Sequence, residues 1–380
     1  MTEAESDVLI IGAGPAGSSA ATVLARAGVR VTVLDRAKFP RDKVCGDAIS
    51  NDGIQILGEL GARADVEAAP HAVVRRAVAV FPDGTRIGRS YDRPGWIVPR
   101  LTLDDCIRRA AEDAGAAVVE GCKVTGLVRE GGRVVGAEGK DARFRARVVI
   151  AADGYGSVGL DALGVKSPKD RYLGVSSTAY YRGVSFDEGP EVSDHYFDRE
   201  LPLGYGWIFP AVDGVSNIGV YLRADGYART GKKLRALLDD FLARHAERFR
   251  GAELVGKVRS WSLPLAPRPV PITAPGLLLA GDAAGFIDPL SGEGIWQALH
   301  TGVLAGEVAR DAIRQGELGP VLRERYERAC RKDIAGPSRR KAWVQRGMDV
   351  IVERRLYRLG IVRAALRLGY EHHALEMTKS

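Results

Sequence analysis

Short apolar runs, each closed by glycine or by an acid, mark the expected strands of this chain, and the first two frame its clearest pattern. Residues 8–11 are apolar, and the glycine-rich stretch 12–17 follows at once. Small residues over 18–27 then recur at helical spacing, and a second apolar run, 29–34, ends in Asp35. The pattern predicts a strand, a glycine turn, a helix and a second strand, the order that a dinucleotide-binding unit requires.

The glycine turn has a chemical reason for each of its small residues. Gly12 allows a tight turn, Gly14 lets the backbone approach a pyrophosphate, and Gly17 lets the helix pack closely on the strand. Ala16 stands in the first turn of the helix, whose free N–H groups favour phosphate. Asp35 follows about twenty residues on and can accept a hydrogen bond from a ribose hydroxyl. We therefore expect a dinucleotide site here; a glycine turn without a ligand is the alternative.

The rest of the chain alternates between strand-like and helical patterns. Alternating apolar and polar positions over 172–222 predict an antiparallel sheet. Residues 276–282 read as a buried strand that ends in an acid, 295–313 as a long helix, and the chain from 321 onward as mostly helical. The expected fold class is α/β: a Rossmann-like nucleotide-binding domain with an inserted antiparallel-sheet substrate domain and a C-terminal helical segment.

The nucleotide-binding domain is expected to be discontinuous, because the strand with the Gly-Asp end returns late in the chain. The predicted division gives it residues 1–75, 98–171 and 268–320, gives the substrate domain 76–97 and 172–267, and gives the helical segment 321–380.

Composition narrows the class of protein. The chain has 380 residues, of which 27% are charged and 46% hydrophobic, as in globular proteins. It has no apolar run of eighteen residues, and its acidic start lacks the apolar core of a signal peptide. Its 4 cysteines show no metal-binding spacing. We expect a cytoplasmic protein with free thiols and no metal site.

The net charge of +7 is concentrated at one end of the chain. Of the 55 basic and 48 acidic residues, 15 and 7 lie in residues 321–380, so the remainder is nearly neutral. This distribution argues against nucleic acid as a partner. From Met348 a helix would place apolar residues beside arginines, so the basic tail is expected to contact an anionic membrane surface or, alternatively, to pack as a lid on the substrate domain.

Three further stretches carry a family resemblance. The chain resembles flavoproteins shaped like para-hydroxybenzoate hydroxylase in three sequence fingerprints. These are the first glycine turn, Asp153-Gly154 with Ser157, and Gly281-Asp282. Within that group the chain resembles the geranylgeranyl reductase family over about residues 6–310. The motifs that carry this likeness are residues 43–47 (KVCGD), 204–210 (GYGWIFP) and 288–294 (DPLSGEG).

The resemblance implies FAD as cofactor and assigns residues to it. Asp35 would hold the adenosine ribose, and Asp282 would meet the ribityl or pyrophosphate oxygens. Arg36 and Arg41 would lie near the adenine or phosphates. The other implied cofactor contacts are Arg100 at the head of its helix, the Val124 backbone at the adenine, Gly292 and Gly294 at the isoalloxazine, and Lys43, Cys45, Asp153 and Gly281 within the motifs.

Cys45, Tyr205 and Trp207 are the candidate catalytic residues. Cys45 lies close in sequence to Lys43 and Arg41, and cationic neighbours lower the pKa of a thiol; a small buried residue is the alternative. Tyr205 and Trp207 alternate with Phe209 in one strand, so their side chains share a face. We expect that face to wall the substrate cavity; simple core packing is the alternative.

The expected reaction is reduction of carbon–carbon double bonds in a prenyl or other apolar substrate, by hydride from reduced flavin and a proton from Cys45 or water. The sequence has no second Gly-x-Gly-x-x-Gly that is followed by an acid about twenty residues on, so transiently bound NAD(P)H or a reduced electron-carrier protein would supply electrons. The main alternative is a flavin-dependent monooxygenase or halogenase. A dehydrogenase and a non-catalytic flavin-binding protein also stay open.

Two departures weigh against the oxygen-using alternative. Ala284 stands where aromatic hydroxylases of this shape often carry His, and Ile295 stands where they tend to carry Asn. Halogenases show Trp-x-Trp-x-Ile-Pro, whereas this chain has Tyr205-x-Trp207-x-Phe209-Pro210, which is closer to the reductase form.

Overall fold

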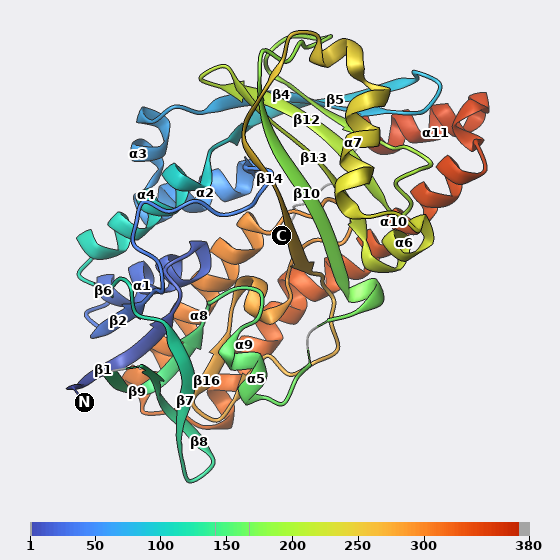
Figure 1. The fold of residues 1–380 in the computed structure, drawn as a ribbon. Helices are drawn as coiled ribbons and strands as arrows, with labels where there is room; N and C mark the ends of the chain where they lie inside the picture. Colours follow the sequence, from blue (N-terminus) through green and yellow to red (C-terminus); the bar gives the residue numbers. More distant parts are fainter. Residues whose placement is uncertain (1, 141, 167, 372–380) are drawn as a thin grey trace.

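Two eight-stranded sheets and the helices around them form the molecule, which we describe from a computed structural model covering residues 2–140, 142–166 and 168–371 (Figure 1). The mixed α/β architecture expected from the sequence is confirmed. The first sheet carries the glycine turn, and the second lies across the cavity from it.

The first sheet has a parallel core in the order β16-β9-β1-β2-β6. Its strands are β1 (Thr2–Ile11), β2 (Val31–Leu34), β6 (Ala117–Val119), β9 (Ala142–Ala151) and β16 (Leu277–Leu279), with β15 (Thr273–Ala274) antiparallel at one edge and the hairpin β7 (Val124–Glu130) and β8 (Arg133–Gly139) attached through β9. Residues 8–10 and 148–150 are fully buried, as expected for parallel strands covered on both faces.

The second sheet follows the order β14-β10-β13-β12-β11-β4-β5-β3. Its strands are β3 (Ala48–Ile49), β4 (Ala72–Val80), β5 (Arg86–Ile97), β10 (Leu173–Arg182), β11 (Val192–Tyr196), β12 (Gly204–Val212), β13 (Val215–Arg223) and β14 (Glu253–Pro264). It is antiparallel except where β11 pairs with β4, which is parallel. That junction joins strands distant in sequence, so the local alternation could not reveal its direction.

Helices cover the first sheet and close the molecule beside the second (Figure 1). They are α1 (Pro15–Arg26), α2 (Asn51–Leu60), α3 (Arg63–Ala68), α4 (Arg100–Asp113), α5 (Val158–Ala162), α6 (Ala224–Thr230), α7 (Leu234–Arg244), α8 (Ile295–Gln315), α9 (Pro320–Cys330), α10 (Gly336–Glu353) and α11 (Gly360–Glu371). The predicted helix beyond 321 is confirmed as α9 to α11, with a π-helical turn at Arg331–Ala335. The last residues of the predicted segment, 372–380, lie outside the described residues.

Small residues let α1 and α8 approach closely behind the glycine turn. A Cβ on Gly302 of α8 would lie 2.2 Å from the carbonyl oxygen of Ala16, and one on Gly306 would lie 3.0 Å from that of Ala20. The small-residue pattern of α1 therefore serves backbone-to-backbone packing, which fixes the head of α1 relative to the strands beneath it.

Within the described part of the chain, every helix is too short or too polar to cross a bilayer. The C-terminal helices instead run beside β5 and the cavity, where Met348, Ile351 and Leu366 pack on a buried cluster that includes Phe81.

Candidate active site

A cavity of about 1860 Å³ reaches from the glycine turn to the second sheet. Its walls come from the β1–α1 turn, the loop 41–52, strands β4, β5 and β12, the loop 282–294, and helices α10 and α11. Pockets for one small ligand usually measure about 300–1,000 Å³. The cavity is therefore large enough for a dinucleotide and a second molecule together.

The glycine turn has the geometry that its sequence predicts. Gly12 has φ +99°, and a Cβ there would lie 2.5 Å from the carbonyl oxygen of Ala152. A Cβ on Gly17 would lie 1.8 Å from the carbonyl oxygen of Gly12. Gly14, in contrast, faces open space, with the Arg41 guanidinium at 3.5 Å from its Cβ position. Gly12 and Gly17 are thus required by the fold, whereas Gly14 leaves room for a ligand.

Asp35 closes the same end of the cavity and is buried. Its carboxylate accepts 2.8 Å hydrogen bonds from the backbone N–H groups of Ala13 and Ala37. These bonds hold the turn against the end of β2 and leave lone pairs for a hydroxyl. Arg36, which is exposed, and Val124 line the cavity beside it.

Ion pairs neutralise most of the charge at this end. Lys43 Nζ lies 3.0 Å from Asp282 Oδ2, although 239 residues separate them in sequence. Arg100, the first residue of α4, donates two 2.7 Å hydrogen bonds to Asp104 one turn on, and Arg41 lies 2.8 Å from the same carboxylate. Burial pushes the pKa of Asp104 up, but the two guanidinium groups outweigh it and leave that pKa below its ordinary value.

Asp153 and Gly281 stand where β9 and β16 end. Asp153 Oδ2 accepts from Val158 N at 2.8 Å, whereas Oδ1 is buried without a partner among the described residues. Burial raises the pKa of this carboxyl. Gly281 has φ +61° and donates its N–H to Thr301, which aims Asp282 into the cavity. The unsatisfied Asp153 oxygen suits a hydroxyl donor of a bound cofactor.

The aromatic residues of β12 share one face and line the other end of the cavity. The ring centroids of Tyr205 and Trp207 are 6.1 Å apart, and those of Trp207 and Phe209 are 5.9 Å apart. His195 packs at 5.4 Å from Tyr205 and at 5.3 Å from Phe209. The rings of Tyr205, Trp207 and Phe209 belong to one buried cluster and also line the cavity, and their role as a substrate wall stays a prediction.

Hydrogen bonds tie the loop of Cys45 to this aromatic wall. Trp207 Nε1 donates to Asn217 Oδ1 at 2.9 Å, and Asn217 Nδ2 donates to the Cys45 carbonyl and to Asp47 Oδ2, both at 2.8 Å. Tyr180 donates a 2.6 Å bond to the same Asp47 oxygen. Burial nevertheless raises the pKa of Asp47 to about 6.

The expectation of a lowered thiol pKa at Cys45 is wrong. Cys45 lines the cavity, and desolvation raises its pKa, because it outweighs the attraction of Arg100 and Lys43. Both cations are already paired with carboxylates, which reduces their effect on the thiol. Cys45 therefore carries a neutral thiol at neutral pH.

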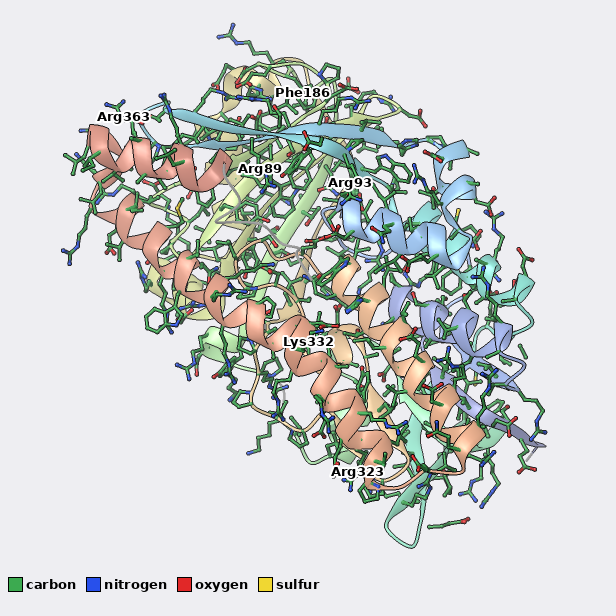
Figure 2. All side chains as sticks on the ribbon, turned by 180° about the vertical axis from the view of Figure 1, so that it is seen from behind. Arg89, Arg93, Phe186, Arg323, Lys332 and Arg363 are labelled. Atoms are coloured by element: carbon green, nitrogen blue, oxygen red, sulfur yellow. The ribbon has the colours of Figure 1, made fainter. Side chains whose placement is uncertain are left out.

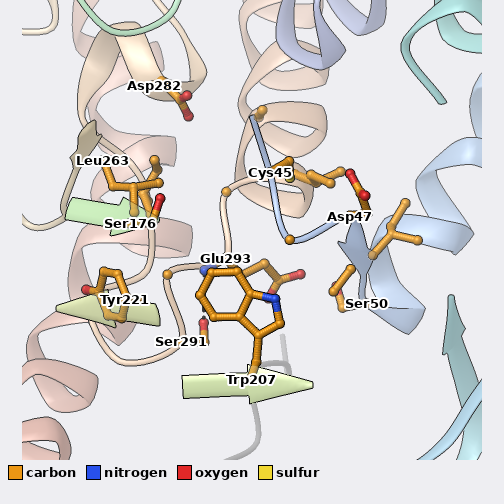
Figure 3. A pocket seen from close by; sticks show the side chains of 18 of the residues that line it. Cys45, Asp47, Ser50, Ser176, Trp207, Tyr221, Leu263, Asp282, Ser291 and Glu293 are labelled. Atoms are coloured by element: carbon orange, nitrogen blue, oxygen red, sulfur yellow. Dashed lines mark hydrogen bonds between the residues drawn. The ribbon is translucent and has the colours of Figure 1, made fainter. Parts of the chain in front are cut away.

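The loop 288–294 brings a carboxyl that the sequence reasoning left unassigned. Asp288 Oδ1 accepts from Leu290 N and Ser291 N at 2.9 and 3.0 Å, and Asp288 Oδ2 pairs with Lys341 at 2.7 Å. Glu293 projects from this braced loop between Gly292 and Gly294 toward Ser50 and Trp207 (Figure 3). Burial raises its pKa to about 7. In the sequence, the position of Glu293 between two glycines of a recognised motif was the only sign that it could belong to the site.

The residues at the turn end fit FAD. They offer an uncapped helix start at Gly14, a buried strand-end acid, an unsatisfied Asp153 oxygen and a cavity of sufficient volume. Of the sequence-predicted contacts, the structure brings Gly12, Gly14, Ala16, Asp35, Arg36, Arg41, Lys43, Cys45, Arg100, Val124, Asp153, Asp282, Gly292 and Gly294 to the cavity wall, and Gly17 and Gly281 directly behind it. Within the described ranges, no three side chains of His, Cys, Asp or Glu lie together as a metal site would require.

Comparison with known proteins agrees with this chemistry. Residues 5–334 match the family model described as FAD binding domain. The chain is 30% identical to the digeranylgeranylglycerophospholipid reductase of Thermoplasma acidophilum over 344 residues, which cover 86% of this chain and 83% of the relative. It is 35% identical to the menaquinone reductase of Mycolicibacterium smegmatis over 315 residues, covering 80% and 76%.

Solved structures share the fold. A geranylgeranyl bacteriochlorophyll reductase-like protein of Thermoplasma acidophilum superposes with a TM-score of 0.84 at 24% identity, covering 98% of this chain and 97% of that one. A flavin-dependent brominase superposes with a TM-score of 0.77 at 22% identity, covering 96% and 93%. A reductase-like protein and a brominase thus share this fold, so the fold alone does not separate the two activities. The relatives found by sequence are named as reductases. The chain belongs to the FAD-binding domain family and, within it, to the geranylgeranyl reductase group of FAD-dependent oxidoreductases.

Proposed function

We propose that this enzyme reduces carbon–carbon double bonds in the prenyl chain of a lipid or quinone, or in a similar apolar substrate. The observation that carries the proposal is the single cavity that joins the FAD-type turn to the aromatic wall of β12. The relatives support it, since their names state reduction of digeranylgeranylglycerophospholipid and of menaquinone.

At the turn end, we assign cofactor binding to the residues predicted from the sequence. The start of α1 and the backbone of Gly14 would face the pyrophosphate, with Asp35 at the adenosine ribose and Asp282 at the ribityl or pyrophosphate oxygens. Gly292 and Gly294 would bring backbone N–H groups to the isoalloxazine. When bound and reduced, FAD supplies a hydride.

At the other end, the chain's own side chains orient the substrate and exclude water. Tyr205 and Trp207 form the flat face against which an isoprene unit can lie. Val344, Met348 and Leu366 from the C-terminal helices add an apolar lining. Burial of such a chain contributes roughly 25 cal/mol per Å² of apolar surface, so the wall holds the double bond without polar contacts.

We assign the electron supply to NAD(P)H bound transiently or to a reduced electron-carrier protein. This proposal rests on the sequence, in which only the Gly-x-Gly-x-x-Gly at 12–17 is followed by an acid about twenty residues on, and we assign that stretch to FAD. Comparing NADPH, NADH and reduced ferredoxin as donors to the purified flavoprotein distinguishes these sources.

The experiment that tests the reaction is anaerobic. Protein with bound FAD is reduced with dithionite and mixed with a geranylgeranyl lipid, or with menaquinone whose ring is reoxidised to the quinone before analysis, and the lipid is examined by mass spectrometry. The proposal expects gain of two hydrogens for each bond reduced, without oxygen. Product that forms only in air, or only with air and bromide, would favour a monooxygenase or halogenase instead.

We further propose that the C-terminal helices rest on an anionic membrane surface. Trp343, Leu359, Ile361 and Leu368 are 70%, 52%, 81% and 60% exposed, and arginines at 354, 355, 358, 363 and 367 are exposed among them. Arg363 lies at the outer side of α11 (Figure 2). The predicted apolar stripe is thus divided, because Val352 and Leu366 pack inward as a lid would.

Vesicle flotation tests this contact. The protein should float with vesicles that contain anionic lipid at low salt, and should be released by high salt, since each arginine contributes about 1 kcal/mol. Serine at Trp343, Ile361 and Leu368 together should abolish flotation. The control places serine at Leu254 and Val321, which are 44% and 41% exposed and lie outside α10 and α11. Equal flotation of the two variants would contradict a membrane contact through the C-terminal helices. The cytoplasmic location of the enzyme stays a prediction.

A further inference from the structure

Glu293 is a buried carboxyl without a fixed partner at the substrate end of the cavity. Both of its carboxylate oxygens are shielded from solvent, and neither makes a hydrogen bond of good geometry to the described residues. The Ser50 hydroxyl is close enough to act as a weak donor, which lowers the pKa of Glu293 by less than burial raises it. Its side chain extends from the loop toward Ser50 and the ring of Trp207 (Figure 3). Leaving a carboxylate ionised in such a place is costly, so the site favours the neutral acid.

The described groups around Glu293 come from five elements, and the cation among them, Lys341, is already paired. Ser50 and Asp52 lie at the start of α2, Tyr91 on β5 and Tyr205 on β12. Asp288 belongs to the same loop, and Lys341 comes from α10, but these two already pair at 2.7 Å. Burial is the largest cause of the raised pKa, and the negative charges of Asp288 and Asp52 add to it. Glu293 therefore holds a proton near neutral pH and can lose it.

The other acids of this end are less suited to proton transfer. Asp47 receives hydrogen bonds from Tyr180 and Asn217 on one oxygen, so it is held as an acceptor that positions the loop. The pKa of the Cys45 thiol is raised by burial, which makes it a poor proton source at neutral pH. Of the two described carboxyls at this end whose pKa burial raises most, Asp47 is held by two hydrogen bonds on one oxygen, whereas Glu293 has both oxygens available to a substrate.

We propose that Glu293 gives the substrate its proton, an inference that rests on the proposed reduction of a double bond. The O–H bond of Glu293 breaks, and its proton forms a C–H bond at one carbon, while the other carbon accepts the hydride of the reduced cofactor. The π bond is lost, the substrate gains two electrons and the cofactor loses two. The Glu293 carboxylate then regains a proton from solvent water.

Three variants and two measurements test the assignment. Glu293→Gln keeps the shape of the side chain but has no acidic proton, and Glu293→Asp keeps the acid on a shorter arm. Asp92→Asn is the control, because that carboxyl lies on the exposed rim of the same cavity. Infrared difference spectra of the FAD-loaded protein across pH 5–9 detect the protonated carboxyl, and anaerobic single turnover measures the rate.

Asp47 and Glu293 should each give a carboxylic acid band in the wild type and in Asp92→Asn, titrating near pH 6 and pH 7. The band near pH 7 should be absent from Glu293→Gln, whereas that of Asp47 should remain. FAD content should stay unchanged. Single-turnover reduction should slow by about 100-fold or more in Glu293→Gln, the usual contribution of a general acid, and recover partly in Glu293→Asp.

Two results would overturn the inference: a band titrating near pH 7 that survives in Glu293→Gln, or wild-type turnover with an unchanged pH profile in that variant. If the wild type reduces no prenyl substrate, the proposed function fails separately. The infrared titration then still decides whether Glu293 holds a proton.

Discussion

The two ends of the cavity bury charge in different ways. At the turn end, charges are paired: Lys43 with Asp282, and Arg100 and Arg41 with Asp104. At the aromatic end Asp288 pairs with Lys341, but Asp47, Glu293 and His195 have no ion pair among the described residues, and burial shifts their pKa values toward the neutral form. Carboxyl pKa values rise there, to about 6 for Asp47 and about 7 for Glu293, and that of His195 falls to about 4.

This difference matches the tasks proposed for the two ends. Fixed backbone donors and ion pairs are suited to holding a cofactor through many turnovers, because their geometry does not change with pH near neutrality. An end that exchanges a proton suits groups whose charged and neutral forms are close in free energy. We therefore expect substitutions at the turn end to change FAD binding, and substitutions at the aromatic end to change pH dependence.

The largest expected effect separates two glycines of the same turn. Gly17→Ala should destabilise the protein by about 3 kcal/mol or more, because its Cβ meets the carbonyl oxygen of Gly12 at 1.8 Å. Gly14→Ala should change the stability of the FAD-free protein by only about 1 kcal/mol, yet lose FAD, since its Cβ enters the ligand space. Thermal unfolding and flavin absorbance measure both; FAD retained by Gly14→Ala would contradict the assigned pyrophosphate site.

A smaller loss of FAD is expected from Asp282→Ala. The change removes an acceptor for a cofactor hydroxyl and leaves Lys43 unpaired, so FAD affinity should fall by roughly 1–3 kcal/mol, about 5–150-fold. Fluorescence titration of the apoprotein with FAD measures it. Glu317→Ala, at an exposed site outside the cavity, is the control, and equal affinities for the two variants would remove Asp282 from the cofactor site.

The aromatic end should show itself in the pH dependence of stability. The pKa of Glu293 is raised from 4.5 to about 7, so the folded state binds more protons than the unfolded state between these values. The free energy of unfolding therefore loses this contribution as pH rises through that window. Glu293→Gln should gain roughly 1–3 kcal/mol relative to wild type between pH 4.5 and pH 8.

Denaturant unfolding at several pH values, with FAD saturating, measures this gain. Asp92→Asn serves as the exposed control and should show no comparable pH-dependent difference. A constant offset between Glu293→Gln and wild type at all pH values would mean that the carboxyl is not buried as described.

The smallest expected effect concerns Cys45. Because burial raises the pKa of its thiol, alkylation by iodoacetamide should be slow at pH 7–8 and should rise only above the ordinary thiol range. Cys45→Ser should retain FAD. Mass spectrometry of the labelled protein locates the modified cysteine, and rapid labelling of Cys45 at pH 7 would restore the reactive-thiol interpretation.

The sequence was most informative where structure and chemistry are local. The strand, turn, helix and strand around Gly12 and Asp35 follow from contiguous residues, and so does the shared face of Tyr205 and Trp207. The parallel pairing of β11 with β4 depends on strands more than a hundred residues apart, which no local alternation encodes.

The charge and pKa of residues in the site depend on side chains that are far away in sequence, so local sequence could not predict them. The positive charge of Lys43 is neutralised by Asp282, 239 residues on, which is why its proximity to Cys45 in sequence was misleading. Asp47 meets Asn217 across 170 residues. The proton-holding character of Glu293 likewise arises from the packing of α2, β5, β12 and α10 around one loop.

Anaerobic stopped-flow spectroscopy of the reduced flavin tests the central claim most directly. Wild-type protein with reduced FAD is mixed with a geranylgeranyl lipid in one experiment and with the fully saturated form of the same lipid in a second. The account predicts reoxidation of the flavin by the unsaturated lipid only, with no oxygen present. Reoxidation at equal rates by both lipids, or by neither until oxygen is admitted, would contradict reduction of the double bond at this cavity.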